Sequence, residues 1–397
     1  MENATAIDIP VADVHTDDVL EVARRITPIV RAASHESERV GSMTPEIVEL
    51  FKRTKLFWLL TPQELGGWGA DIITTMKVLE MLSRADASAG WSLMANVNST
   101  GFIGGAGSEA LLELIHGGPE QPIVAGMFAP LCRAERVDGG FMLGGSYSFG
   151  SGSKHANWLA AGALLADGDS SREIVYFAPR AEVNLKENWD VIGLVGTGSY
   201  DYEIPRRFVD EDLIIYRQGA EILRGQPSMR LDLPSIAAAG HAAVALGMGL
   251  QSIDELQKVL AARKPRAGQV GAADQQLFRH GFSLAEGRFR AARSYCYELF
   301  AEGLATVEGG DRLSELQIHR LRQVTTLVHH AAYEMADFAF TWSGSGALRA
   351  KSAMGRCFRD VRVAMNHIYV DPSTLTNASP LILASYASDE DLVGFEG

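Results

Sequence analysis

The chain has 397 residues and a formal net charge of −13, which excludes a protein that holds nucleic acid through a basic surface. Hydrophobic residues make up 47% and charged residues 21%, a composition that excludes an intrinsically disordered chain. Eighteen of the 40 glycines lie between residues 101 and 200, so we expect that stretch to be built from turns rather than helices.

The N-terminus and the cysteines indicate the compartment. The first 18 residues carry four aspartates where a signal peptide would have a basic and then an apolar segment. Cys132, Cys296 and Cys357 are too far apart for a C-x-x-C pair, and no apolar run approaches the roughly 18 residues that span a bilayer. We therefore expect a cytoplasmic protein with three reduced thiols.

The first part of the chain has the period of helices. Apolar residues recur every three or four positions between 19 and 33, which predicts one amphipathic helix. Thr44 and Pro45 predict the N-cap and first turn of a second helix, and a third is expected over 71–82, after the glycine-rich segment 65–69. The chain is expected to stay helical to about residue 117.

Between about 122 and 217 the pattern changes to short β-like stretches. Asp138-Gly139-Gly140 predicts a hairpin turn, because glycine readily adopts positive φ. Strands are expected over 141–148, 158–165, 174–178 and 200–204, which together predict a small antiparallel sheet.

From residue 234 onward the helical period returns in long blocks. Helices are expected over 236–260, 272–304, 315–340 and about 353–369, the last ending at Asp371-Pro372. The predicted fold class is mainly α with a central antiparallel β domain. The predicted domains are an N-terminal helical domain (1–121), a middle β domain (122–217) and a C-terminal helical domain (218–397).

Local motifs taken one at a time indicate little. Ser151 and Lys154 match the S-x-x-K of some hydrolases, but a glycine-serine loop often contains a lysine. His330 and Glu334 lie one helical turn apart, yet no second such pair completes a metal site, so none is predicted. His155 and His367 stand out by position, although such a histidine, taken alone, is more often structural than catalytic.

The order of segments resembles the acyl-CoA dehydrogenase fold, whose C-terminal domain is a four-helix bundle. Four motifs in order resemble the flavin-dependent two-component monooxygenases of that fold: 86–91, 137–152, 189–199, and 359–362 followed by His367. That group includes the oxygenase components for 4-hydroxyphenylacetate, the steroid A-ring phenol, dibenzothiophene, and indole and indole-3-acetate.

The resemblance implies a chemistry and a set of partners. A separate reductase would supply reduced flavin, either FAD or FMN, and O2 would convert it to a C4a-hydroperoxyflavin. That species would hydroxylate or epoxidise an aromatic or heteroaromatic small molecule, indole-like or phenol-like. The resemblance also implies a homotetramer, because this fold usually completes its flavin site across subunits.

The resemblance assigns roles to particular residues. Ser151 would hydrogen-bond near the flavin N5, and His367 would serve the substrate as hydrogen-bond partner or as a general base titrating near neutrality. The nearby glycines would let the backbone approach the flavin ring, and those at 101–107 would shape the substrate side. The remaining predicted contacts are Phe128, Ala129, Trp189, Thr197, Gly198 and Arg263 for the flavin, and Trp91, Asn98 and Ser99 for the substrate.

Two departures from the family patterns bear on the reaction. Acyl-CoA dehydrogenases would carry a Tyr-Glu-Gly where this chain has His367 and Ile368, so the glutamate that abstracts the α-proton is missing there. Ser99 occupies the place of a histidine that holds the phenolate in phenol hydroxylases. A substrate that must be deprotonated at that point is therefore disfavoured, and a neutral aromatic or heteroaromatic group such as an indole or a thioether is favoured. An acyl-CoA dehydrogenase-type oxidoreductase and a catalytically idle ligand-binding member of the fold remain the alternatives.

Overall fold

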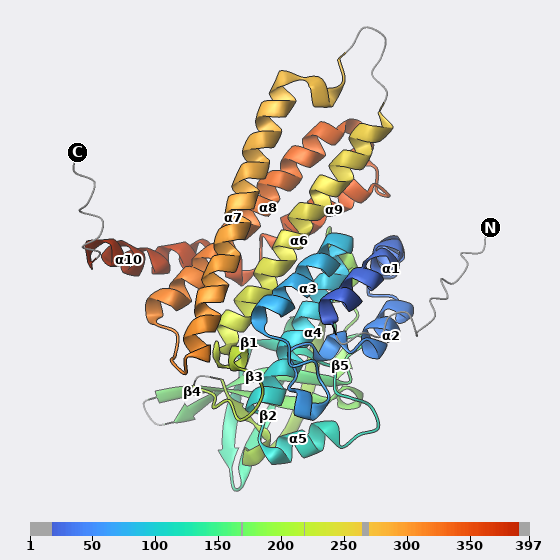
Figure 1. Cartoon of the computed structure of the whole chain (residues 1–397). Helices are drawn as coiled ribbons and strands as arrows, with labels where there is room; N and C mark the ends of the chain where they lie inside the picture. Colours follow the sequence, from blue (N-terminus) through green and yellow to red (C-terminus); the bar gives the residue numbers. More distant parts are fainter. Residues whose placement is uncertain (1–17, 168–169, 218, 264–269, 389–397) are drawn as a thin grey trace, which may run out of the picture.

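The predicted order of helices, sheet and helices is present in the computed structural model (Figure 1). The structure describes residues 18–167, 170–217, 219–263 and 270–388, with the backbone alone at 129, 130, 166, 167, 170, 171 and 388. The fold class predicted from the sequence is therefore confirmed.

Five helices form the N-terminal region: α1 (Val19–Val40), α2 (Pro45–Arg53), α3 (Ile72–Ala85), α4 (Ala87–Ala106) and α5 (Glu109–His116). The side chain of Asp71 caps α3 by accepting from the amide of Thr74. Thr44 precedes α2 as predicted, but its side chain makes no capping hydrogen bond, so Pro45 is what favours the start of that helix.

The middle region is one seven-stranded sheet. Its strands are β1 (Val124–Val137), β2 (Gly140–Gly150), β3 (Trp158–Asp167), β4 (Ser170–Pro179), β5 (Asn184–Leu185), β6 (Tyr200–Asp210) and β7 (Ile215–Tyr216), in the order β5-β6-β2-β1-β3-β4-β7. Gly139 turns β1 into β2 with φ 76, as predicted.

The prediction of a wholly antiparallel sheet is wrong for one pair, because β1 and β3 are parallel. The chain crosses back after β2, so that β3 pairs with the free side of β1 while running antiparallel to β2 in direction. Alternation of side chains along a strand reports which face is buried and not which strand lies beside it. The sheet is therefore mixed.

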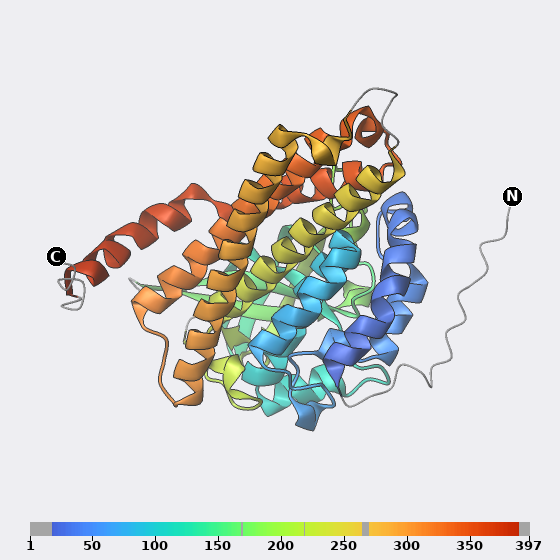
Figure 2. The same cartoon turned by 45° about the horizontal axis from the view of Figure 1, so that its top comes forward.

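Four helices of the C-terminal region form a bundle: α6 (Leu233–Ala262), α7 (Gln276–Glu308), α8 (Glu315–Ser343) and α9 (Ala353–Ala364). The last helix was predicted to run to about residue 369 and the helical region to end at Pro372. Instead α9 ends at Ala364, and Pro372 starts α10 (Pro372–Ser388), which extends away from the body (Figure 2). Proline is tolerated in a first helical turn, where its missing N–H is not needed.

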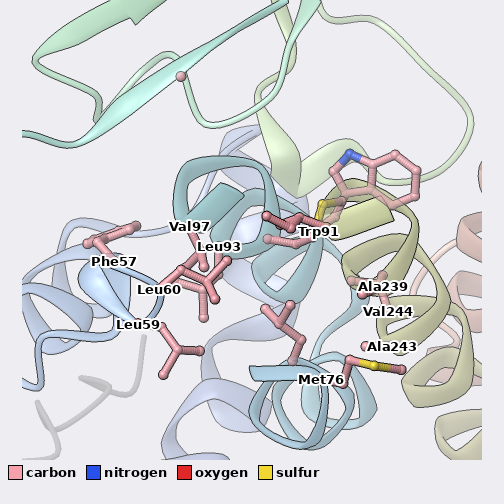
Figure 3. Packing of buried hydrophobic residues seen from close by; sticks show 14 of the residues in the cluster. Phe57, Leu59, Leu60, Met76, Trp91, Leu93, Val97, Ala239, Ala243 and Val244 are labelled. Atoms are coloured by element: carbon pink, nitrogen blue, oxygen red, sulfur yellow. The ribbon is translucent and has the colours of Figure 1, made fainter. Parts of the chain in front are cut away.

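Helix α6 packs in the centre of the molecule. It is long and apolar enough to cross a membrane, but 83% of its most apolar stretch is buried by the other elements, as in a core helix. Ala239 and Ala243 of α6 face Leu93 and Val97 of α4 within one hydrophobic core (Figure 3). Trp91, also on α4, projects away from that group toward the β region.

Candidate functional site

A cavity of about 130 Å³ lies where α4, the start of α6, the sheet and the segment after α9 meet. It gathers six of the residues singled out from the sequence, namely Trp91, Asn98, Ser99, Phe128, Ser151 and His367. Its other lining residues are Met94, Ala95, Gly126, Arg217, Leu233, Pro234, Ala237, His241 and Tyr369.

A chain of hydrogen bonds leads from the cavity into the loop before β6. The indole Nε1 of Trp91 donates to Ser151 Oγ at 3.1 Å, and Ser151 Oγ lies 2.8 Å from Ser199 Oγ. Ser199 Oγ lies 2.7 Å from Thr197 Oγ1, which donates to the carbonyl of Leu194 at 2.7 Å. The predicted residues Trp91, Ser151 and Thr197 therefore belong to one network. Ser199 is the last residue of the motif 189–199.

The two ends of this network fix the direction of every hydroxyl proton in it. A hydroxyl has one proton and two lone pairs. Thr197 gives its proton to a carbonyl, so it must accept from Ser199, and Ser199 must in turn accept from Ser151. Ser151 Oγ thus donates its proton to Ser199 Oγ and accepts from Trp91 Nε1 with one lone pair. Its remaining lone pair makes Ser151 Oγ an acceptor toward any ligand, which suits an N–H group such as the N5–H of a reduced flavin.

Leu194 anchors the far end of the network. Its backbone has φ 52, a left-handed conformation that is unusual for leucine, and its N–H donates to the carboxylate of Asp360 at 2.6 Å. Its carbonyl also accepts from Trp189 Nε1 at 3.1 Å. Burial raises the pKa of Asp360 to about 7, although the bond from Leu194 opposes the shift. The motif residue Asp360 is thus connected to Trp189 and Thr197 through the backbone of one residue, Leu194.

Two histidines and a tyrosine form the opposite wall of the cavity. The ring centroids of His241 and His367 are 3.9 Å apart, and both rings contact Trp91 and Tyr369. Burial lowers the pKa of His367 to about 4 and that of His241 well below its usual range. Both rings are therefore neutral at pH 7.

The expectation that His367 titrates near neutrality is wrong, because its ring is desolvated. Its Nδ1 accepts from the amide of Tyr369 at 3.4 Å, which places the proton of the neutral ring on Nε2. That arrangement suits a hydrogen-bond donor better than a general base. His241 was missed as a site residue since one histidine in an apolar helix gives no pattern that points to a cavity.

The substrate side predicted on α4 is buried and polar. Asn98 donates to Met94 Sδ at 3.4 Å, while its Oδ1 is buried with no hydrogen-bond partner in the part of the chain described. Ser99 lies beside it, 7% exposed. The histidine that phenol hydroxylases carry at this position has no counterpart on α4, but His241 enters the same cavity from α6.

An apolar surface next to Ser151 suits a flat ring. Phe149 has φ 65 and is 61% exposed, its ring meets Trp189 edge-on at 6.1 Å, and Ile192 is 70% exposed. Large apolar side chains held in solvent at a strained backbone position commonly mark a binding surface. Together with the acceptor at Ser151, these residues fit a flavin ring.

Four of the glycines singled out from the sequence lie very close to other segments of the protein. A Cβ on Gly152 would lie 2.5 Å from Asn96 Oδ1, one on Gly193 would lie 2.4 Å from the carbonyl of Arg359, and one on Gly198 3.1 Å from that of Gly41. Gly101 would likewise meet Leu60. These four glycines let neighbouring protein segments approach one another, and the approach of the backbone to a flavin ring stays a prediction.

Other predicted residues lie outside the cavity. Arg263 donates to the carbonyls of Trp342 and Ser343 at the end of α8. It follows His241 by 22 residues of α6, about 33 Å of helix, so within one chain it is remote from Ser151. The backbone at Phe128 and Ala129 falls in a gap of the β1–β3 pairing. The side chain of Ala129, and the neighbouring Lys264 and Arg266 considered with Arg263, lie outside the described residues.

His155 and Glu334, also considered from the sequence, have structural contacts. His155 Nε2 lies 2.8 Å from Asn96 Oδ1, and burial lowers the pKa of His155 to about 3. Glu334 pairs with Arg288 across α7 and α8. Lys154 is exposed, and Ser151 is bonded to Trp91 and Ser199.

Comparison with known proteins gives the family context. The family model for the acyl-CoA dehydrogenase N-terminal domain matches residues 19–113, and that for the acyl-CoA dehydrogenase C-terminal domain matches 239–372, together more than half of the chain. The chain is 28% identical over 357 residues to an indole-3-acetate monooxygenase of Pseudomonas putida, covering 88% of this chain and 90% of the relative.

Two solved structures share the fold. The 3-HSA hydroxylase from Rhodococcus sp. RHA1 has a TM-score of 0.86 at 21% identity, covering 94% of this chain and 97% of the other. XiaF from Streptomyces sp., solved in complex with FADH2 and glycerol, has a TM-score of 0.84 at 20% identity, covering 92% and 95%.

Proposed function

Because this chain is a flavin-dependent monooxygenase of the acyl-CoA dehydrogenase family, we propose that it is the oxygenase component for an aromatic or heteroaromatic small molecule, indole-like or phenol-like. A separate reductase would deliver the reduced flavin, FAD or FMN. We further propose a cytoplasmic homotetramer, in which Arg263 of one subunit could meet the flavin phosphate of another.

The observation that carries the proposal is the directed hydrogen-bond network ending at Ser151. It leaves Ser151 Oγ as an acceptor in a cavity that the neutral ring of His367 also lines. Reduced flavin has an N5–H where oxidised flavin has a lone pair, so an acceptor at this point favours the reduced form. When bound near Ser151, the flavin would supply the electrons that activate O2 for transfer of one oxygen atom to the substrate.

The cavity walls supply the other requirements of an oxygenase. Trp91, Phe128 and Leu233 form apolar surface that excludes water from the substrate. Asn98, with its unpartnered Oδ1, and His367 are the polar groups that orient it. We assign His367 to hydrogen bonding with the substrate, because burial makes it a weak base.

The experiment that tests the proposal is rapid mixing of the protein and reduced flavin with O2. A long-lived C4a-adduct spectrum, followed by oxygenated product when an aromatic substrate is present, is the expected result. Immediate reoxidation with all electrons appearing as hydrogen peroxide would refute it. If neither flavin state binds, the protein is an idle ligand-binding member of the fold.

The dehydrogenase alternative lacks a base. Among the residues that line the cavity there is no carboxylate, and Ile368 is 76% exposed in the place of the glutamate. Reduction of the bound oxidised flavin by an acyl-CoA would nevertheless favour that reaction, so this measurement belongs beside the first one.

A further inference from the structure

Arg217 is the one charged side chain among the residues that line the cavity. His241 and His367 share this cavity but are neutral at pH 7 because burial lowers the pKa of each. The positive charge of Arg217 acts on Tyr369 in the same cavity, because it opposes the rise that burial causes in the pKa of Tyr369. A single cation in a cavity lined by aromatic rings favours a ligand that has both an aromatic ring and a negative charge.

The guanidinium of Arg217 is fixed by one ion pair, which does not use all of its hydrogen-bond donors. Its Nη1 donates to Glu173 Oε2 on β4 at 2.7 Å, which is the only side-chain hydrogen bond of Arg217 within the described residues. An arginine side chain carries five N–H donors in a rigid fork that matches a carboxylate. Glu173 therefore orients the group and leaves donors free for a ligand.

We propose that Arg217 binds the carboxylate of an aromatic acid, so that the preferred substrate is an aromatic ring carrying an acidic side chain. This inference rests on the proposed function, of which it specifies the substrate class. The ring would lie against Trp91 and the histidine wall, and the acidic group would lie at the Arg217 end of the cavity.

Charge and size favour a carboxylate over a phosphate. Glu173 already balances the charge of Arg217, so one added monoanion leaves a net charge of −1 at the pair, whereas a phosphate dianion leaves −2 in a partly buried place. A cavity of about 130 Å³ also suits a small aromatic ring.

The test compares a charged probe and its neutral counterpart, indole-3-acetate and indole. Binding to the full chain with reduced flavin, in the absence of O2, is measured by calorimetry. The wild type is expected to prefer indole-3-acetate. Arg217→Gln should lower the ratio of the two affinities by about tenfold to a hundredfold, the value of one charge-assisted hydrogen bond. Glu173→Gln should raise it, because the cation loses its competing anion.

Two further variants separate this role from a structural one. Arg217→Lys keeps the charge without the fork and should give an intermediate ratio. Arg206→Gln removes an exposed arginine that pairs with Glu135 on the sheet, and the ratio should match that of the wild type. Equal ratios in the wild type and Arg217→Gln, or a fall of the ratio in Glu173→Gln, would overturn the inference.

Failure of the proposed function would look different. Admission of O2 to the same samples tests whether the bound probe is oxygenated. Selective binding of indole-3-acetate without any oxygenated product would reject the oxygenase reaction for this probe while leaving the assignment of Arg217 intact. Oxygenated product from both probes, bound with equal affinity, would reject the assignment of Arg217 while leaving the oxygenase reaction intact.

Discussion

Thr197→Val is the sharpest test of the hydrogen-bond network at Ser151. Valine has nearly the shape of threonine, but it removes the hydroxyl that donates to Leu194 and accepts from Ser199, both at 2.7 Å. Ser199 then has no acceptor on that side, so its proton turns toward Ser151. Ser151 Oγ would accept from both Trp91 and Ser199, and its own proton would face the ligand. The substitution therefore converts Ser151 from an acceptor into a donor.

The magnitude follows from the bonds that are lost. Thr197 is 2% exposed, and each buried hydrogen bond contributes about 1 kcal/mol net, so the free energy of unfolding should fall by about 1–2 kcal/mol. The Leu194 carbonyl keeps its bond from Trp189, which limits the loss. Inverting Ser151 exchanges one favourable bond to reduced flavin for one to oxidised flavin, so the ratio of the two affinities should fall at least about fivefold.

The assay measures binding of reduced and oxidised flavin to the full chain, together with denaturant unfolding. Ser153→Ala is the matched control, because Ser153 lies two residues from Ser151 and its Oγ is buried with no partner in the described structure. This control should not lower stability and should leave the affinity ratio as in the wild type. An unchanged ratio in Thr197→Val, or the same change in Ser153→Ala, would refute the directional network.

Three further predictions concern other parts of the site. The pKa of Asp360 is about 7 in the folded protein against 3.8 ordinarily, so the stability that its proton provides is present below pH 3.8 and is lost as the pH rises through 7, by about 1.4 kcal/mol per pH unit. Asp360→Asn should remove this pH dependence of the free energy of unfolding. A difference between variant and wild type that does not change with pH would contradict the prediction. His367→Ala should lower the product yield and leave adduct formation intact. Because the pKa of His367 is about 4, titration of its ring should not change the yield between pH 6 and 8, which product analysis over that pH range would show. Phe149→Gly should raise the free energy of unfolding by about 1 kcal/mol, because glycine relieves the strain of the positive φ, and it should weaken flavin binding. Unimpaired flavin binding would contradict the assignment of Phe149 to the flavin surface.

The local sequence determined which segments are helices and strands. The three-four spacing from Val19 and the glycines after Asp138 act through neighbouring residues, so they could be read without the fold. The family motifs also pointed to Trp91, Ser151 and His367, which do line one cavity. Their proposed roles stay predictions until the variants are measured.

Tertiary structure alone decided what surrounds those residues. Trp91 meets Ser151 across 60 positions of chain, and Leu194 meets Asp360 across 166, distances at which no periodic pattern carries information. The neutral state of His367 and the presence of Arg217 in the same cavity depend on packing of elements from three regions. A sequence gives the identity of a titratable group, but its charge is set by desolvation and by neighbours that packing brings together.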